Sequence, residues 1–316
     1  MERDLTVTKS RRWRFGDRTF ANLTLFFALV LVGILLAIVV VLNIDAVPAI
    51  VKFGFGFITG TSWNAVTEQF GALPAIYGTL VTSAIGLIIA VPISLGAAVF
   101  LVELAPAWVR GPGSFLIEML AAIPSVIIGL WGLFVMVPNF ARPLQVWLKT
   151  HLGFIPLFQG QVFGLSFLAA GMVLAIMVIP IITAVSRDAM RAVPVQQREA
   201  MLALGATRWE TIRRAVLPYC RSGLVGAVIL GLGRALGETM AVTMVIGNKY
   251  IVTPSLTSAG TTISSKIAGE FGEAVGNVFI ASLVELALVL FAVTLLVNVI
   301  ARVFVWRMTS VKAARE

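Results

Sequence analysis

Long apolar stretches alternate with short polar segments along the whole chain. Six of the stretches reach the length of about 20 residues that a helix needs to cross a bilayer. They lie near residues 21–43, 74–101, 115–138, 163–186, 222–247 and 277–301. A segment in lipid must satisfy its backbone polar groups internally, so each stretch is expected to be helical. The pattern predicts an all-α, polytopic membrane protein, with a transmembrane domain at 21–305 between a polar segment at 1–20 and a tail at 306–316.

Prolines interrupt three of these stretches. Proline removes a backbone donor and crowds the preceding turn, so kinks or breaks are expected inside the membrane. Neighbouring helices or water can satisfy the freed carbonyls. The prolines in question are Pro92, Pro124 and Pro180.

Three acidic residues lie within or beside the apolar stretches. Glu285 falls inside the sixth stretch, where we expect it to pair with a neighbouring helix or to border a wet cavity rather than to bind a ligand. Glu103 and Glu118 lie near predicted helix ends, so solvated or interfacial positions are expected for both.

Composition indicates a membrane protein that is poorly equipped for catalysis of its own. Hydrophobic residues make up 59% of the chain and charged residues 12%, whereas a soluble domain is about a quarter charged. Cys220 is the single cysteine and His151 the single histidine, which excludes an internal disulfide framework and removes the usual metal ligands. We therefore expect no catalytic residues, no metal and no cofactor held by this chain.

The distribution of lysine and arginine predicts the orientation. With the N-terminus inside, 18 of these residues fall in cytoplasmic segments and 5 in outside loops, as the positive-inside rule requires. The first apolar stretch is longer than the core of a signal peptide and has no Ala-x-Ala site, so it is expected to remain as an anchor. The net charge of +9 is thus a topology signal, and nucleic-acid binding is not expected.

Two opposite charges lie inside the fifth stretch. Arg234 and Glu238 are separated by one predicted helical turn in Gly-Leu-Gly-Arg-Ala-Leu-Gly-Glu-Thr-Met. An ion inside the bilayer is costly unless it is paired or faces water, so this pair is a candidate for a substrate pathway. A purely structural ion pair between residues four apart is the alternative. Gly233 and Gly237 match the close-packing Gly-x-x-x-Gly pattern of membrane helices.

The basic segment 187–218 separates the fourth stretch from the fifth. Within it, Gly205 is expected to end one short helix as a C-cap, and a second helix is expected to start near Thr207, with Glu210 at capping-box spacing. Such a helix–turn–helix at the membrane surface could dock a partner protein. Physical reasoning alone leaves a second interpretation, a basic amphipathic loop lying on anionic lipid.

This segment closely resembles the EAA signature of permease subunits of bacterial ATP-binding-cassette importers. The pattern Glu-Ala-Met-(x)3-Gly-(x)9-Ala-Val-Leu-Pro departs from the family form only at Met201 and Ala215. In that family the segment couples to a cytoplasmic ATPase, which implies coupling roles for Glu199, Ala200, Gly205, Leu217 and Pro218. The chain contains no G-x-x-x-x-G-K-[ST] phosphate-binding loop, so ATP would be bound by a separate partner.

The resemblance extends over nearly the whole chain. Tyr77-Gly-Thr-Leu-Val-Thr-Ser, Ala122-Ile-Pro-Ser-Val and Gly231-Leu-Gly-Arg-Ala-Leu-Gly-Glu-Thr-Met-Ala are similar to phosphate-importer permeases, and Ser264-Ser-Lys-Ile-Ala-Gly-Glu-Phe-Gly-Glu-Ala points to their PstC-type branch. The resemblance implies a bacterial inner-membrane location and a phosphate pathway through Arg234 and Glu238. It also implies three partners: a homologous PstA-type permease, a dimer of cytoplasmic ATP-binding subunits and a periplasmic phosphate-binding protein.

Alternatives to this function remain open at the level of sequence. Arginine also recognises sulfate and molybdate, so the choice of phosphate rests on the resemblance. An ATP-independent anion transporter or channel would use a similar ion pair, but it should show inverted repeats or discontinuous helices and has no need of segment 187–218. A role in signalling phosphate status could coexist with transport.

Overall fold

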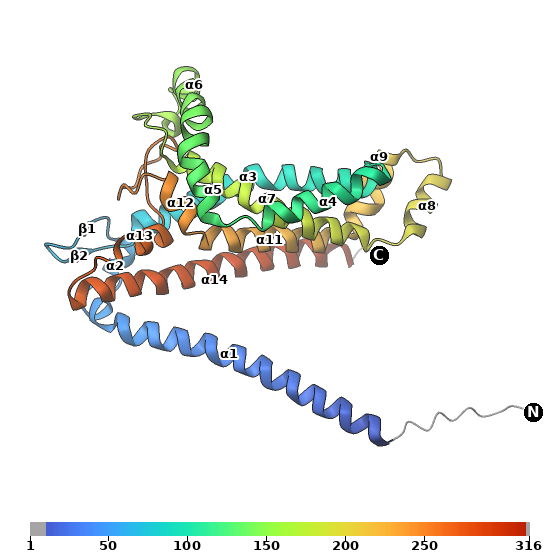
Figure 1. Cartoon of the computed structure of the whole chain (residues 1–316), viewed down its shortest axis with the longest axis horizontal. Coiled ribbons are helices and arrows are strands. Elements are labelled where there is room, and N and C mark those ends of the chain that lie inside the picture. The colour runs from blue at the N-terminus through green and yellow to red at the C-terminus, as the bar shows by residue number, and fades with distance from the viewer. Residues whose placement is uncertain (1–10, 314–316) are drawn as a thin grey trace, which may run out of the picture.

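The computed structural model describes the backbone of residues 11–313 and the side chains of residues 17–303 (Figure 1). The predicted N-terminal segment 1–20 and tail 306–316 lie partly outside these residues. The elements run in the order α1 (Arg11–Phe53), α2 (Gly56–Thr59), β1 (Trp63–Asn64), β2 (Gln69–Phe70), α3 (Leu73–Val99), η1 (Phe100–Leu104), α4 (Ala107–Ala121), α5 (Ser125–Trp131), η2 (Gly132–Ala141), α6 (Arg142–Leu152), η3 (Pro156–Phe158), α7 (Phe167–Arg191), α8 (Val195–Ala203), α9 (Arg208–Thr211), η4 (Ile212–Val216), α10 (Leu217–Tyr219), α11 (Arg221–Gly237), α12 (Met240–Val245), α13 (Ile263–Glu270) and α14 (Asn277–Ala313).

The predicted all-α membrane architecture is confirmed. Five helical stretches in the described chain are long and apolar enough to cross a membrane, and the bent pair Arg208–Tyr219 with Arg221–Gly237 makes a sixth when the pair is counted as one span. The pair bends by 71° at its break. A single two-stranded hairpin, with Trp63 opposite Phe70, is the only sheet within the described part of the chain.

Helix α7 forms the centre of the bundle. Of the 18 most apolar consecutive residues of α7, 67% are buried, whereas none of the 18 most apolar consecutive residues of α1 is buried. Helices α3 and α11 pack along α7. The α3–α7 crossing is close: a Cβ added to Gly171 would lie 2.4 Å from Cγ2 of Ile85, so only glycine allows the two backbones to approach this far.

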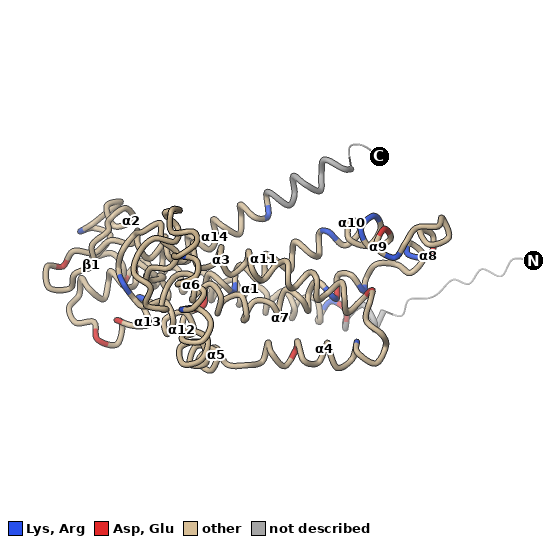
Figure 2. The backbone as a smooth tube through the Cα atoms, turned by 90° about the horizontal axis from the view of Figure 1, so that it is seen from above, with Lys and Arg blue, Asp and Glu red and all other residues tan. Residues whose placement is uncertain are grey.

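Helices α1 and α14 form the periphery. They contact each other, and α1 then runs away from the bundle (Figure 1). Helix α8 lies at one end of the molecule, which we call the α8 end. Helix α1 begins at this end, and α14 ends there. The opposite end, which we call the loop end, carries the hairpin, α6 and the irregular segments 153–166 and 246–262. Figure 2 shows that charged residues gather at these two ends, while the tube between them is largely uncharged.

The third span was predicted at 115–138 with a kink or break at Pro124; the break is observed, but the span lies further along the chain. Helix α4 ends at Ala121, and α5 begins only at Ser125. Pro124, expected to cause a kink or a break, directly precedes α5 with a ψ of 139°, and a proline here disfavours a helical conformation of Ile123 before it. The crossing stretch is instead Ser125–Leu152, formed by α5, η2 and α6. Pro92 and Pro180 lie inside α3 and α7.

The predicted fifth span at 222–247 is wrong as a continuous helix. Helix α11 ends at Gly237, the backbone of Glu238 is extended with ψ of 128°, and α12 starts at Met240. Gly237 precedes the break, and glycine lowers the cost of leaving the helical conformation. The break falls directly on the candidate ion pair.

Candidate functional site

Arg234 and Glu238 remain close despite the break between their helices. Nη2 of Arg234 lies 3.8 Å from Oε2 of Glu238, which is an electrostatic contact but too long for a hydrogen bond. The arginine side chain is 42% exposed and the glutamate side chain only 8%. The guanidinium therefore faces outward with its donors largely free, while the carboxylate is held inside the protein.

Local side-chain contacts stabilise the broken helix. Oε1 of Glu238 accepts a long hydrogen bond of 3.4 Å from the backbone N–H of Ala241, in the first turn of α12. The hydroxyl of Thr239 donates to the carbonyl of Gly237 at 3.3 Å, and that of Thr243 donates to the carbonyl of Thr239 at 2.7 Å. Such contacts allow a non-helical backbone at membrane depth. Discontinuous helices were expected of a secondary transporter, so the break itself does not distinguish the two transport classes.

Arg234 lies on a face of α11 that the rest of the chain leaves uncovered. A Cβ added to Gly226, Gly233 or Gly237 would meet no atom within 4 Å, and Leu230 is 56% exposed. These positions recur at helical spacing, so they form one stripe. The close packing predicted for Gly233 and Gly237 is therefore not made within this chain. An arginine on such a face needs water or another protein surface beside it.

The helix–turn–helix predicted within segment 187–218 is confirmed. Helix α8 ends at Ala203, and Gly205, two residues later, has a φ of +82°. The N–H groups of Gly205 and Ala206 donate to the carbonyls of Leu202 and Met201 at 2.9 and 3.1 Å. This arrangement satisfies the last helical carbonyls and requires a left-handed residue, which favours glycine.

The second helix of the segment begins with the predicted capping box. The side chain of Glu210 accepts a 2.9 Å bond from the backbone N–H of Thr207 and another of 2.9 Å from its hydroxyl, while the Thr207 hydroxyl accepts from the N–H of Glu210. These hydrogen bonds, the backbone bond first, lower the pKa of Glu210. The turn between α8 and α9 is thus fixed at both sides of Gly205.

The surface of this segment is open. Glu199 and Ala200 are exposed, and three large apolar side chains project into solvent: Leu202, Leu204 and Trp209 are 49%, 84% and 61% exposed. Leu217 is half-buried beside a cluster containing Met190, Val193 and Val216, and Pro218 is exposed just before the 71° bend.

Two ion pairs that anchor this segment were missed by sequence reasoning. Arg198 of α8 pairs with Glu103 at 2.8 Å, and it also donates to the carbonyls of Met190 and Val193. Of the two positions expected for Glu103, solvated or interfacial, the solvated one is not observed: its side chain is only 12% exposed, and the guanidinium of Arg198 compensates its charge.

The second anchoring pair joins α7 to α4. Arg187, 8% exposed, contacts Glu118 at 3.0 Å and Asp188 at 3.1 Å. Glu118 is 55% exposed, as expected for a residue near a helix end. Both anchoring pairs join residues that are distant in sequence, and neither was signalled by local spacing.

Glu285 is 7% exposed, and its Oε2 has no hydrogen-bond partner among the described residues. The pairing with a neighbouring helix that we considered is therefore not observed. The carboxyl lies on α14 between Leu283 and Leu286, which belong to an apolar cluster with Phe57 and Ile263.

Comparisons with known proteins agree on one family. The family profile described as binding-protein-dependent transport system inner membrane component matches residues 90–310. The phosphate transport system permease protein PstC of Haemophilus influenzae is 47% identical over 97% of this chain and 99% of its own length. The protein of the same description from Mesorhizobium japonicum is 45% identical over 96% of this chain and 94% of its own length.

Solved structures agree on the fold. A bacterial ABC transporter involved in the import of alginate matches with a TM-score of 0.55 and 19% identity, over 93% of this chain and 99% of the other. The MetNI methionine ABC transporter, in an inward-facing conformation, matches with a TM-score of 0.50 and 20% identity, over 72% of this chain and 94% of the other.

Proposed function

The chain belongs to the family of binding-protein-dependent transport system inner membrane components, and we propose that it is the permease subunit of an ATP-driven importer for inorganic phosphate. The observation that carries the proposal is the partly exposed Arg234 on an uncovered face of an intramembrane helix. The full-length similarity to phosphate permeases supports the choice of anion.

The uncovered stripe on α11 is one wall of the translocation path. A homologous PstA-type permease supplies the opposite wall, so this chain forms half of the path. The proposal explains why the Gly226, Gly233 and Gly237 positions are open: small residues let a second helix approach closely or leave room for an anion.

The geometry of the ion pair suits transient binding of a tetrahedral oxyanion. A guanidinium presents five donors in a fixed fork, and the 3.8 Å separation from Glu238 leaves them available. The nearby carboxylate repels the anion and so keeps the affinity low enough for release. Phosphate thus passes Arg234 without any bond being made or broken in this chain.

Coupling to ATP takes place through segment 187–218. The exposed surface around Ala200, Leu202 and Leu204 docks on a dimer of cytoplasmic ATP-binding subunits, which hydrolyse the ATP. The Arg198–Glu103 pair transmits the displacement of α8 to the end of α3, and the 71° bend at Pro218–Arg221 transmits it to α11. No ATP is bound by the permease itself.

The orientation follows from these assignments. The α8 end, where α1 begins and α14 ends, faces the cytoplasm, so both termini are cytoplasmic. The loop end faces the periplasm, where a phosphate-binding protein delivers the anion. The excess of lysine and arginine in the segments at the α8 end supports this direction in a bacterial inner membrane.

A second candidate function is an ATP-independent anion transporter, because such transporters also contain broken helices like α11–α12. Purification in detergent separates the two, because an ATPase should accompany an importer permease and should be absent from a lone transporter. The direct test is uptake of radiolabelled phosphate by cells lacking this chain, with and without a plasmid that restores it. Restored phosphate uptake with unchanged sulfate uptake supports the proposal, whereas restored uptake of sulfate alone contradicts it.

A further inference from the structure

Three cations at the loop end have no carboxylate partner. Of the basic residues there, Lys52 pairs with Glu68, and Lys266 pairs with Glu270. The remaining three form no ion pair within the described chain: they are Arg142, Lys149 and Lys249. Their positive charge is therefore available to a ligand.

All three cations border one short segment, residues 159–164. Nζ of Lys149 donates to the carbonyl of Gly160 at 2.7 Å. A Cβ added to Gly164 would lie 3.4 Å from Cβ of Arg142, so these residues are in contact. Lys249 shares a pocket with Gln161 of the same segment. Of the three cations only Lys249 lines this pocket, and a charge in a concave surface raises the local concentration of counter-ions.

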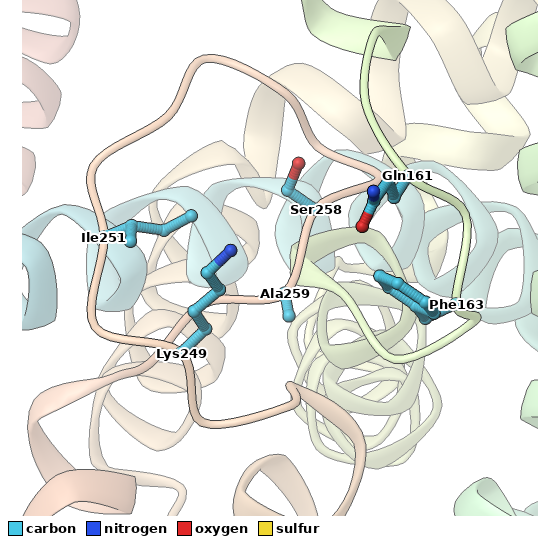
Figure 3. Close-up of a pocket in the computed structure, with 6 residues that line it drawn as sticks. All are labelled: Gln161, Phe163, Lys249, Ile251, Ser258 and Ala259. Carbon is cyan, nitrogen blue, oxygen red and sulfur yellow. The ribbon is translucent and has the colours of Figure 1, made fainter.

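The pocket beside this segment has the shape and chemistry of a small polar site (Figure 3). Its volume of about 290 Å³ is near the lower end of the range of small-molecule sites. Ser258 lies between Lys249 and Gln161, so an ammonium, a hydroxyl and an amide line the same space. The rest of the lining is formed by Phe163, Ile251 and Ala259.

The backbone before Lys249 directs this lysine into the pocket. Helix α12 is followed by two consecutive left-handed residues, Gly247 with φ of +88° and Asn248 with φ of +50°. Asn248 donates from its side chain to the carbonyl of Thr243 at 3.1 Å, and a Cβ on Gly247 would lie 2.7 Å from Cβ of Ala259. The turn is therefore packed directly against the opposite wall of the pocket. Glycine and asparagine are the residues that adopt the left-handed conformation most readily, so this sequence fixes the turn that leads to Lys249.

The opposite wall is held by backbone hydrogen bonds. The N–H of Gly260 donates to the carbonyl of Ile246 at 3.0 Å, and the N–H of Leu256 donates to the carbonyl of Leu157 at 2.8 Å. Ser258 is therefore on a segment fixed to both neighbouring loops. The pocket is preformed rather than dependent on a mobile loop.

A single short helix connects the pocket with the ion pair. Helix α12 has six residues, which corresponds to a rise of about 9 Å, and it starts two residues after Glu238 and ends four residues before Lys249. The pocket thus lies at one end of a helix of about two turns, and Glu238, the partner of Arg234, lies just before its other end.

We propose that this pocket is a staging site for inorganic phosphate, in which Lys249, Ser258 and Gln161 hold the anion before it passes to Arg234. The proposal rests on the proposed import function. The lysine supplies the charge, and the hydroxyl and the amide donate hydrogen bonds to phosphate oxygens. A single exposed ammonium binds weakly, which suits a site that must release its ligand. The site captures phosphate released by the binding protein and prevents its return to the periplasm.

The test measures phosphate transported per ATP hydrolysed, in proteoliposomes that contain the whole transporter and its binding protein. Lys249→Gln should lower this ratio by about three- to tenfold, because the local anion concentration falls when the charge is removed. ATPase activity stimulated by the binding protein should stay at the wild-type level. Lys249→Arg should retain the ratio, as should Lys52→Gln, which removes a paired lysine at the same end of the molecule.

A second measurement detects the anion at the pocket directly. Lys249→Cys should react with a negatively charged methanethiosulfonate, and inorganic phosphate, but not chloride, should slow the reaction at equal ionic strength. The wild-type chain, whose single cysteine Cys220 is buried, serves as the control for reaction at any site other than position 249. A positively charged methanethiosulfonate should restore the transport ratio.

The outcomes separate the hypotheses. Wild-type vesicles that fail to accumulate phosphate would overturn the proposed function itself. A wild-type ratio in Lys249→Gln, or no protection by phosphate, would overturn the staging site alone. Loss of binding-protein-stimulated ATPase activity in Lys249→Gln would assign the pocket to protein docking and would also overturn it.

Discussion

The carboxylate of Glu238 lies 3.8 Å from the guanidinium of Arg234, although the helix that carries Arg234 ends one residue before Glu238. The ion pair therefore spans a break instead of one turn of a regular helix. The arginine faces outward, while the glutamate bonds to the first turn of α12. A movement of α11 relative to α12 would change the contact between the two charges, so the pair is positioned to respond to the state of the transporter.

Gly205 should be essential for coupling to the ATPase. Its φ is +82°, so Gly205→Asp forces a side chain into a left-handed conformation at a cost of about 1 kcal/mol or more. The misplaced turn should abolish ATP-dependent phosphate uptake while the chain remains in the membrane. Gly96→Ala is a matched control, since an added Cβ meets no atom there and the backbone is helical. Normal uptake and normal ATPase association in Gly205→Asp would contradict the assigned role.

Arg198 should hold α8 on the bundle. Arg198→Ala leaves Glu103 nearly buried without its cation and removes the bonds to the carbonyls of Met190 and Val193. We expect a loss of roughly 1–3 kcal/mol of stability, seen as a lower melting temperature in detergent. Uptake should fall further than protein abundance. The control is Arg208→Ala, an exposed arginine of the same segment; equal effects of the two changes would refute the anchoring role.

The orientation can be tested with introduced cysteines. Val66 and Val275, at the loop end, are 94% and 85% exposed, and Leu204, at the α8 end, is 84% exposed. An impermeant thiol reagent applied from the periplasm should label Val66→Cys and Val275→Cys but not Leu204→Cys. Thr257 lies in the same connection between α12 and α14 as Val275, but it would be a poor reporter because it is only 1% exposed. Labelling of Leu204→Cys in intact spheroplasts would show that the α8 end faces the periplasm and would contradict the proposed orientation.

Sequence reasoning was most successful where the determinants are local. The positive φ of Gly205 and the capping box between Thr207 and Glu210 depend on residues within a few positions of one another, and both were predicted. The six apolar stretches follow from the length that a membrane imposes on a helix. The candidate pair of Arg234 and Glu238 follows from the cost of charge in lipid.

Sequence reasoning failed where tertiary packing decides. The break at Glu238 interrupts an apolar run without any proline, and the local contacts that stabilise it, such as that of Glu238 with Ala241, become visible only once the backbone has left the helical conformation. The burial of Glu103 depends on Arg198, which lies 95 residues further along the chain. No periodicity in a single sequence reports a contact of that kind.

The ion pair itself gives the sharpest test of the pathway. Arg234→Gln should abolish phosphate uptake but leave the complex assembled, since the arginine side chain is 42% exposed and its 3.8 Å contact with Glu238 is too long for a hydrogen bond. Arg234→Lys should retain an intermediate rate, because an ammonium keeps the charge but loses the planar fork. Glu238→Gln should slow turnover, since the anion is then held more tightly or the guanidinium shifts. Membrane abundance, ATPase copurification and uptake are measured for each variant.

A purely structural pair predicts a different pattern for the same residues. Each single change would then remove protein from the membrane, and the exchange Arg234→Glu with Glu238→Arg would restore abundance and uptake together. The geometry argues against such a rescue: an arginine at position 238 would lie beside the N–H of Ala241 in the first turn of α12, where a carboxylate is favoured and a cation is not. The exposure of 42% for Arg234 against 8% for Glu238 shows that the two positions are not equivalent. Full phosphate uptake in Arg234→Gln would exclude Arg234 from the pathway. A fully assembled Arg234→Gln complex that takes up no phosphate would support a role of Arg234 in the pathway.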